Sequence, residues 1–288
     1  MTTEHAQAQG YDRELRIAID LARNAGASIL EFYNRPIEVL QKFDNDGREP
    51  VTLADRTANE LIVNGLRQHF PDDGVLAEES EDTDRRLGKQ RVWMVDPLDG
   101  TNGFIDGNGD FAVQIGLAVD GLAVLGVVYQ PLTDLLYRAV RGQGTWIESA
   151  AGDLKAARVS EHTTLAQMRL AASRSHRSPR MDQVVRALGV KHEVQRGSVG
   201  IKVGLIIEQQ CDLYVHLSSR TKQWDTCAPQ IILTEAGGRF SDLFGNPITY
   251  NGAEIQNRNG LVATNGVAHQ RVLTTLAPLL AEFGRVPV

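Results

Sequence analysis

The stretch WMVDPLDGT at residues 93–101 places two carboxylates three positions apart, directly after an apolar run. Pro97 has a fixed φ and favours an extended backbone at Asp96, so the turn can aim Asp96, Asp99 and the Leu98 carbonyl at one point. Hard divalent cations bind such oxygen atoms, and Mg²⁺ is usually held by a few carboxylates together with substrate phosphates. An ordinary surface turn is the simpler interpretation of Asp-Pro and Asp-Gly pairs. Acidic residues elsewhere in the chain favour a metal site.

Those other acidic residues stand at the ends of expected elements. Glu78 follows a predicted strand at 75–77, Asp55 lies in the first turn of a predicted helix at 52–70, and Asp225 opens another helix. Alone, each is typical of a helix cap or a solvated charge. Carboxylates gathered at one cleft repel one another unless cations neutralise them. The pattern therefore predicts a site for two or more divalent ions.

Such a site suits the transfer of a phosphoryl group to water. One ion generates the nucleophile from a bound water, and another supports the leaving oxygen. Backbone N–H groups after Gly100, where a short helix begins, are candidates to hold the phosphate. Thr101 and Asp55 are candidates to orient and deprotonate the water.

The acidic motifs resemble those of a known superfamily. Segments 78–79, 96–101 and 224–229 are similar to three signatures of the lithium-sensitive, Mg²⁺-dependent phosphatases that include inositol monophosphatases, and the likeness spans residues 15–265. It implies an α/β fold, the layered αβαβα sandwich shared with fructose-1,6-bisphosphatase. It also implies two or three Mg²⁺ ions in each active site, and it allows a homodimer, since members often form dimers.

The resemblance assigns roles to individual residues of this chain. It implies metal ligands, namely Glu78, Asp96 and the Leu98 carbonyl for a first ion, and Asp96, Asp99 and Asp225 for a second. Asp55 matches the acidic residue that works with Thr101 on the attacking water.

Two further segments resemble one branch of the superfamily. Residues 173–176, SRSH, and 197–202, GSVGIK, are similar to the CysQ branch of 3'(2'),5'-bisphosphate nucleotidases. That branch removes the 3'-phosphate of adenosine 3',5'-bisphosphate, a by-product of sulfur metabolism. A second phosphate needs cationic or hydrogen-bonding groups away from the metals, and Ser173, His176 and Lys202 are candidates. The simpler alternative is an ordinary loop at 173–176 and a solvated lysine at 202.

Two departures from that branch leave the substrate open. Asn102-Gly103 stands where nucleotidases often have Lys-Glu, and Ser219-Arg220 replaces a common Gly-Pro. An inositol monophosphatase or a broad sugar-phosphate phosphatase is therefore the close alternative. A noncatalytic nucleotide or metal sensor is a third hypothesis, although each expected metal-binding and water-activating position is filled.

Composition narrows the class of partner. The formal net charge is −6, from 30 basic and 36 acidic residues, which disfavours binding to nucleic acid polymers or anionic membranes. A polar N-terminus and the lack of an apolar run near ~20 residues favour a cytoplasmic protein whose partner is a small phosphorylated molecule. Cys211 and Cys227 lack CxxC spacing, so we expect buried thiols.

Hydrophobic periodicity predicts two parts. Residues 1–150 form an α+β metal-binding subdomain, with helices at 15–32 and 52–70 covering a largely antiparallel sheet that includes a hairpin at Asp120-Gly121. Residues 151–288 form an α/β substrate-binding subdomain. Its predicted strands are 170–172, 211–215 and 261–264, and its predicted helices are 179–188, 199–208, 225–236 and 267–283.

Overall fold

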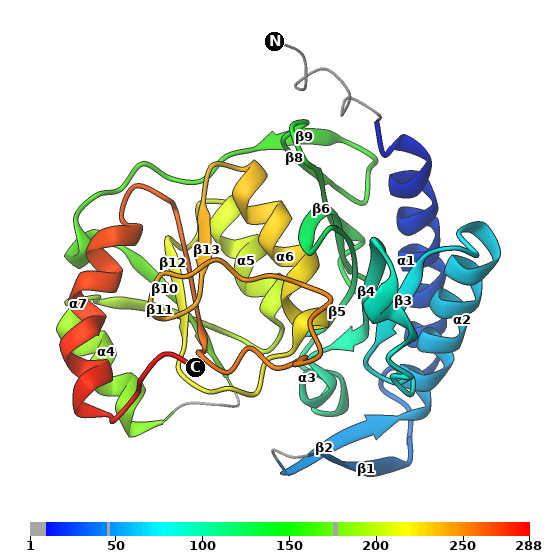
Figure 1. The fold of residues 1–288 in the computed structure, drawn as a ribbon, viewed down its shortest axis with the longest axis horizontal. Coiled ribbons are helices and arrows are strands. Elements are labelled where there is room, and N and C mark those ends of the chain that lie inside the picture. The colour runs from blue at the N-terminus through cyan, green and yellow to red at the C-terminus, as the bar shows by residue number, and fades with distance from the viewer. Residues whose placement is uncertain (1–9, 45–46, 175–177) are drawn as a thin grey trace.

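The computed structural model describes residues 10–44, 47–174 and 178–288. Layers of helix, sheet, helix, sheet and helix follow one another across the molecule (Figure 1). The layered αβαβα sandwich implied by the resemblance is confirmed. None of the helices within these ranges is both long and apolar enough to cross a membrane.

The first sheet is largely antiparallel, as predicted. In spatial order its strands are β3 (Gly74–Ala77), β4 (Arg91–Asp99), β5 (Ala112–Val119), β6 (Leu122–Gln130), β7 (Leu135–Val140), β8 (Thr145–Glu148) and β9 (Leu154–Ala157). Only β3 and β4 pair in parallel within this sheet. Asp120 and Gly121 both have positive φ, 51° and 75°, which closes the β5–β6 hairpin with the twist that hairpins favour.

Two helices cover the outer face of this sheet. They are α1 (Asp12–Phe32) and α2 (Leu53–His69), and their buried faces join the sheet in one apolar cluster. The three- and four-residue spacing of Ala18, Ala22, Ala25 and Ile29 puts all four side chains on that face.

The second sheet mixes parallel and antiparallel pairing. In spatial order its strands are β11 (His192–Arg196), β10 (Arg169–Ser173), β12 (Leu213–His216), β14 (Leu261–Thr264) and β13 (Arg239–Ser241). Helices α5 (Val199–Ile207) and α6 (Gln223–Glu235) lie between the two sheets, and their apolar residues form one cluster with both. Helices α4 (Pro179–Leu188) and α7 (His269–Glu282) form the last layer.

The structure differs from the sequence-based expectation in several elements. A hairpin of β1 (Val39–Asp44) and β2 (Gly47–Thr52) precedes α2, and no strand was predicted there. Strands β9, β11 and β13 were also missed. Because β9 pairs with β8, the first sheet continues past residue 150, where we placed the division between subdomains. Cys211 and Cys227 are free and buried, as predicted.

The largest local difference concerns residues 96–99. We expected a tight turn directly after the apolar run that precedes Asp96, but β4 continues through Asp99. Its register against β5 shifts between Asp96, which faces Gln114, and Asp99, which faces Ala112. An extra residue on one strand is a β-bulge, and a bulge admits proline and re-aims the neighbouring side chains.

Candidate active site

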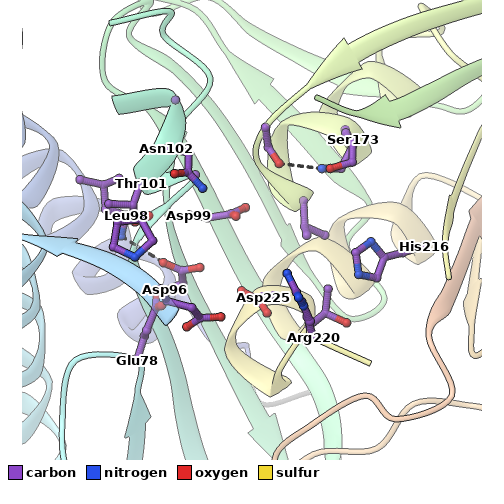
Figure 2. Close-up of a pocket in the computed structure, with 18 of the residues that line it drawn as sticks. Glu78, Asp96, Leu98, Asp99, Thr101, Asn102, Ser173, His216, Arg220 and Asp225 are labelled. Carbon is purple, nitrogen blue, oxygen red and sulfur yellow. Dashed lines mark hydrogen bonds between the residues drawn. The ribbon is translucent and has the colours of Figure 1, made fainter. Parts of the chain in front are cut away.

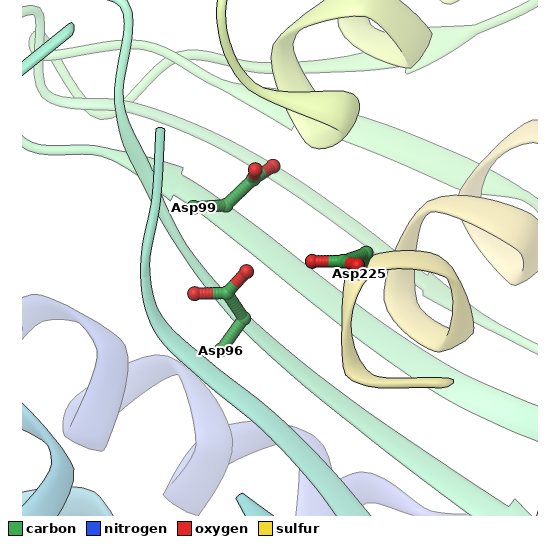
Figure 3. A group of neighbouring side chains, drawn as sticks. All are labelled: Asp96, Asp99 and Asp225. Atoms are coloured by element: carbon green, nitrogen blue, oxygen red, sulfur yellow. The ribbon is translucent and has the colours of Figure 1, made fainter. Parts of the chain in front are cut away.

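Three carboxylates converge at one end of β4. Asp96 and Asp99 lie on either side of the bulge in β4, and Asp225 comes from the first turn of α6 (Figure 3). One oxygen atom from each of the three lies within 4.8 Å of the others. The bulge and the end of a helix from the other half of the chain thus bring together residues that are more than a hundred positions apart in sequence.

Asp99 is held by donors on one of its two oxygens. Its Oδ2 accepts hydrogen bonds from the Ser198 hydroxyl at 2.5 Å, from Gln114 Nε2 at 2.6 Å and from the Gly200 amide at 3.1 Å. Ser198 is also the N-cap of α5, where it accepts a bond from the Ile201 amide. Oδ1 takes part in none of these bonds and remains available for a ligand.

Asp225 is anchored in a similar way. It is the third residue of α6, and its Oδ2 accepts a 2.6 Å hydrogen bond from the Lys222 backbone amide. This is the reciprocal half of a capping box, in which an acidic side chain reaches back to the residue before the helix. The capping of α6 therefore fixes the position of a carboxylate that is a candidate metal ligand.

Asp55 occupies the same position in α2. Its Oδ2 accepts hydrogen bonds from the Thr52 amide at 2.8 Å and the Thr52 hydroxyl at 2.6 Å, which completes a capping box. Its Oδ1 accepts a 3.0 Å hydrogen bond from the Thr101 hydroxyl. Burial raises the pKa of Asp55, so this carboxylate is a stronger base than an exposed one. The structure thus brings together the two residues predicted to act on water.

The electrostatics of the three aspartates favour the binding of a cation. Burial, followed by the charge of Glu78 and the two other aspartates, raises the pKa of Asp96 well above its ordinary value. The pKa of Asp225 rises to about 8 through burial and then the charges of Asp99 and Glu78. Like charges in a buried site favour protonation unless a cation is present. The donor set is entirely carboxylate and carbonyl oxygen, which suits a hard divalent cation such as Mg²⁺.

Glu78 lies at the edge of this cluster. It follows β3, its amide bonds to the Val95 carbonyl at 3.0 Å, and its side chain lines the same pocket. The Lys42 ammonium, from the β1–β2 hairpin, contacts both Glu78 and Glu79. Glu78 is not among the three residues whose oxygens converge, although its charge acts on all three.

The turn after β4 forms part of the pocket wall. Gly100 has φ 100° and caps α3 (Thr101–Ile105), and a Cβ there would lie 2.3 Å from the Asp110 carbonyl oxygen. Only glycine fits that combination of positive φ and close approach. Gly100 and Thr101 line the pocket, where the first amides of α3 have no partner within the helix.

The opposite side of the pocket comes from the C-terminal part of the chain (Figure 2). Ser173, a predicted substrate-binding residue at the end of β10, lines the pocket. His176, another predicted substrate-binding residue, lies outside the described residues.

Lys202 also lines the pocket, but it is not the solvated lysine of the simpler interpretation. It is 1% exposed, and its Nζ donates a 2.7 Å hydrogen bond to the Gly197 carbonyl. The ammonium also lies 4.8 Å from the centroid of the Tyr214 ring. Burial lowers the pKa of Lys202 to about 8, against the opposing effect of Asp99, Asp110 and Asp225.

Several pocket residues were not among the predicted site residues, and three of them lie close together in sequence. Tyr214, His216 and Arg220 come from β12 and the segment that leads to α6. The Tyr214 hydroxyl lies 3.2 Å from His216 Nδ1, and the Ser218 hydroxyl lies 2.7 Å from His216 Nε2. A departure from the nucleotidase pattern at 219–220 was the one sequence signal that pointed to this segment.

Comparisons with known proteins agree with this geometry. The family model of the inositol monophosphatase family matches residues 11–280. The chain belongs to the inositol monophosphatase family. Members of this family are metal-dependent phosphatases, and the chain is accordingly a phosphatase of the family.

Curated relatives carry two kinds of name. Over 237 residues the chain is 38% identical to the 3'(2'),5'-bisphosphate nucleotidase CysQ of Escherichia coli (strain K12), an alignment that covers 81% of this chain and 92% of that protein. Over 255 residues it is 31% identical to the histidinol-phosphatase of Chlorobaculum parvum, covering 88% of this chain and 95% of that protein.

Solved structures show the same fold. CysQ from Bacteroides thetaiotaomicron, described as a bacterial member of the inositol monophosphatase family, matches with a TM-score of 0.73 and 30% identity, covering 88% of this chain and 97% of that one. An inositol monophosphatase from Thermotoga maritima matches with a TM-score of 0.79 at 24% identity, covering 94% of this chain and 100% of that one.

Proposed function

We propose that this chain is a Mg²⁺-dependent phosphomonoesterase that hydrolyses adenosine 3',5'-bisphosphate to AMP and phosphate. The observation that carries the proposal is the convergence of Asp96, Asp99 and Asp225 beside the hydrogen-bonded pair of Thr101 and Asp55. The name of the relatives at 38% identity supports the nucleotide as substrate.

The metal-binding residues would be the converging aspartates together with Glu78 and the Leu98 carbonyl. Gly100 and Thr101, where α3 begins, line the same pocket as these residues, so the first amides of α3 are candidates to hold the phosphate there. A divalent cation supplies an activated water and offsets negative charge on the phosphate in the transition state. The chain's own contribution is to fix the positions of these ligands before substrate arrives.

Thr101 and Asp55 would handle the proton of the attacking water. In the structure the Thr101 hydroxyl donates to Asp55 Oδ1, so its oxygen lone pairs are available to a water in the pocket. As the new O–P bond forms, the water proton passes to Thr101 Oγ1 and the hydroxyl proton passes to Asp55 Oδ1. The bond between phosphorus and the 3' oxygen breaks on the opposite side, and the departing oxygen takes a proton from a solvent water to become the 3'-hydroxyl.

A substrate panel tests the proposal. Phosphate release is measured with adenosine 3',5'-bisphosphate, inositol 1-phosphate, histidinol phosphate and fructose 1,6-bisphosphate, each with Mg²⁺ and with EDTA. We expect Mg²⁺-dependent release and the highest kcat/KM for the nucleotide. Activity that survives EDTA would overturn the metal assignment. A preference for inositol 1-phosphate or histidinol phosphate would leave the phosphatase class intact and replace the substrate.

A further inference from the structure

The pocket has two sides of opposite character. One side carries the metal-binding carboxylates of β4 and α6, and the other carries Ser173, His216 and Arg220 from β10, β12 and the segment after β12 (Figure 2). Lys202 of α5 also lines the pocket. A substrate with two phosphates places the reacting one at the carboxylates, where cations neutralise them. Its second phosphate is repelled by the same carboxylates and must lie near positive groups on the other side.

Lys202 is poorly placed for that second phosphate. Its ammonium is almost fully buried, donates to the Gly197 carbonyl and lies over the Tyr214 ring. Its charge also serves as the counter-charge of Asp99, which is buried beside it. Moving the ammonium to a ligand would give up these contacts, so Lys202 acts on the reacting side of the pocket.

His216 is also poorly placed for the second phosphate, because its two ring nitrogens contact the Tyr214 and Ser218 hydroxyls. These contacts fix the ring beside the pocket. The ring therefore shapes the pocket, and the positive charge that binds the second phosphate must come from another residue.

Arg220 is that residue. It is an exposed residue of the segment between β12 and α6, and it lines the pocket. Within the described residues, no carboxylate forms an ion pair with its guanidinium, whereas the nearby Lys222 pairs with Glu49 at 3.1 Å. An arginine offers parallel N–H donors that match two phosphate oxygens, and an exposed arginine needs little desolvation to use them.

We infer that Arg220 binds the second, non-reacting phosphate and so determines the preference for bisphosphorylated substrates. This inference rests on the proposed function, because it assumes that the substrate carries two phosphates. Arg220 contacts a group that does not change during hydrolysis, so the contact is equally strong in the ground state and the transition state. Its loss must therefore raise KM and leave kcat nearly unchanged.

The test compares Arg220→Ala and Arg220→Lys with wild type on adenosine 3',5'-bisphosphate and on adenosine 3'-monophosphate. Arg186→Ala is the matched control, because Arg186 is an exposed arginine on α4 in the outer layer and its removal changes net charge equally. For Arg220→Ala we expect KM for the bisphosphate to rise roughly 10- to 100-fold, as befits a lost charge-assisted contact. KM for the monophosphate and kcat for both substrates should stay within about twofold of wild type. Arg220→Lys should recover part of the loss, and Arg186→Ala should match wild type.

Two results would overturn the inference while leaving the proposed function intact. In the first, Arg220→Ala keeps the wild-type preference for the bisphosphate. In the second, Arg220→Ala lowers kcat/KM equally for both substrates, which would assign Arg220 a structural role. A wild-type enzyme that does not prefer the bisphosphate would overturn the proposed function itself, and the inference with it.

Discussion

The two sides of the pocket differ in how their side chains are held. On the carboxylate side, Asp55, Asp99 and Asp225 each give one oxygen to backbone or hydroxyl donors of the fold. On the other side, Arg220 is exposed and has no carboxylate partner among the described residues. Buried groups with several fixed partners keep one geometry, whereas an exposed arginine can adapt to its ligand.

This difference suggests a division of labour. Catalysis needs reacting groups held to within a fraction of an ångström before substrate arrives, which the carboxylate side provides. Substrate choice needs only a contact of modest strength at a fixed distance from the reacting phosphate, which we propose that Arg220 provides. Substitutions on the first side should therefore lower kcat, and substitutions on the second should raise KM for particular substrates.

The largest effect is expected at the metal ligands. Asp225→Asn removes one charge but keeps an amide oxygen that can accept the hydrogen bond from the Lys222 amide, so the capping of α6 survives. Loss of a cation that contributes several kcal/mol to the transition state corresponds to a fall in kcat of about 1,000-fold or more. The measurement is phosphate release over a range of Mg²⁺ concentrations.

The circular dichroism spectrum should match wild type and the melt should remain cooperative, which separates loss of the site from loss of the fold. Turnover near the wild-type rate at saturating Mg²⁺ would show that Asp225 is not a metal ligand, and the comparison between the two sides would lose its main support.

A smaller effect is expected at Thr101. Thr101→Ala removes the hydroxyl that donates to Asp55 Oδ1, and general-base catalysis typically contributes roughly 10²- to 10⁴-fold. We expect a fall of that size in kcat, with little change in the Mg²⁺ concentration needed for half-maximal thermal stabilisation. Thr101→Ser should restore most of the rate, because it keeps the hydroxyl. Equal rates for the alanine and serine variants would contradict a proton-transfer role.

Much of the carboxylate side could be predicted from the sequence. Thr52 and Asp55 form a local capping pattern, and Asp225 stands at a helix start, so helix-capping rules placed both. The helices themselves follow apolar periodicity, and α4 and β14 have the predicted bounds. The resemblance supplied the order of the motifs and the layered fold.

Other features depend on contacts that a sequence does not display. The bulge at 96–99 breaks the two-residue alternation on which strand prediction relies. Strand β2, GREPVT, contains a proline and charged residues, and β11, HEVQR, is a polar edge strand, so neither has a typical strand pattern.

Asp110 also has a role that no local sequence pattern indicates. Its carbonyl oxygen would lie 2.3 to 2.9 Å from a Cβ built on Gly100, Gly103 or Gly197, and its carboxylate accepts a 2.7 Å hydrogen bond from Arg174 Nε. It thus joins the turn after β4 to the segments that begin α5 and follow β10. Such a junction exists only once the fold has formed.

The smallest predicted effect concerns the stability of the metal-free protein. Burial and neighbouring carboxylates raise the pKa of Asp225 from 3.8 to about 8. A carboxyl group with a raised folded-state pKa holds its proton more tightly in the folded than in the unfolded protein, so its ionisation destabilises the fold. This cost is absent below about pH 3.8, grows as pH rises and is complete above about pH 8. Asp225→Asn cannot ionise and escapes the cost.

In EDTA, we therefore expect the Tm of Asp225→Asn, relative to that of wild type, to increase between pH 5.5 and pH 8. The increase should be on the order of a few °C, because a change of 1 kcal/mol in unfolding free energy moves Tm by about 2–4 °C in chains of this size class. Saturating Mg²⁺ should reverse the order at pH 8, because it stabilises the wild-type site by mass action and the variant site much less. Arg220→Ala, on the exposed side, should melt like wild type under both conditions. If Asp225→Asn were less stable than wild type at pH 8 in EDTA, the buried carboxylate would contribute more to the fold than its repulsion costs. The carboxylate side would then be built for stability as well as for metal binding.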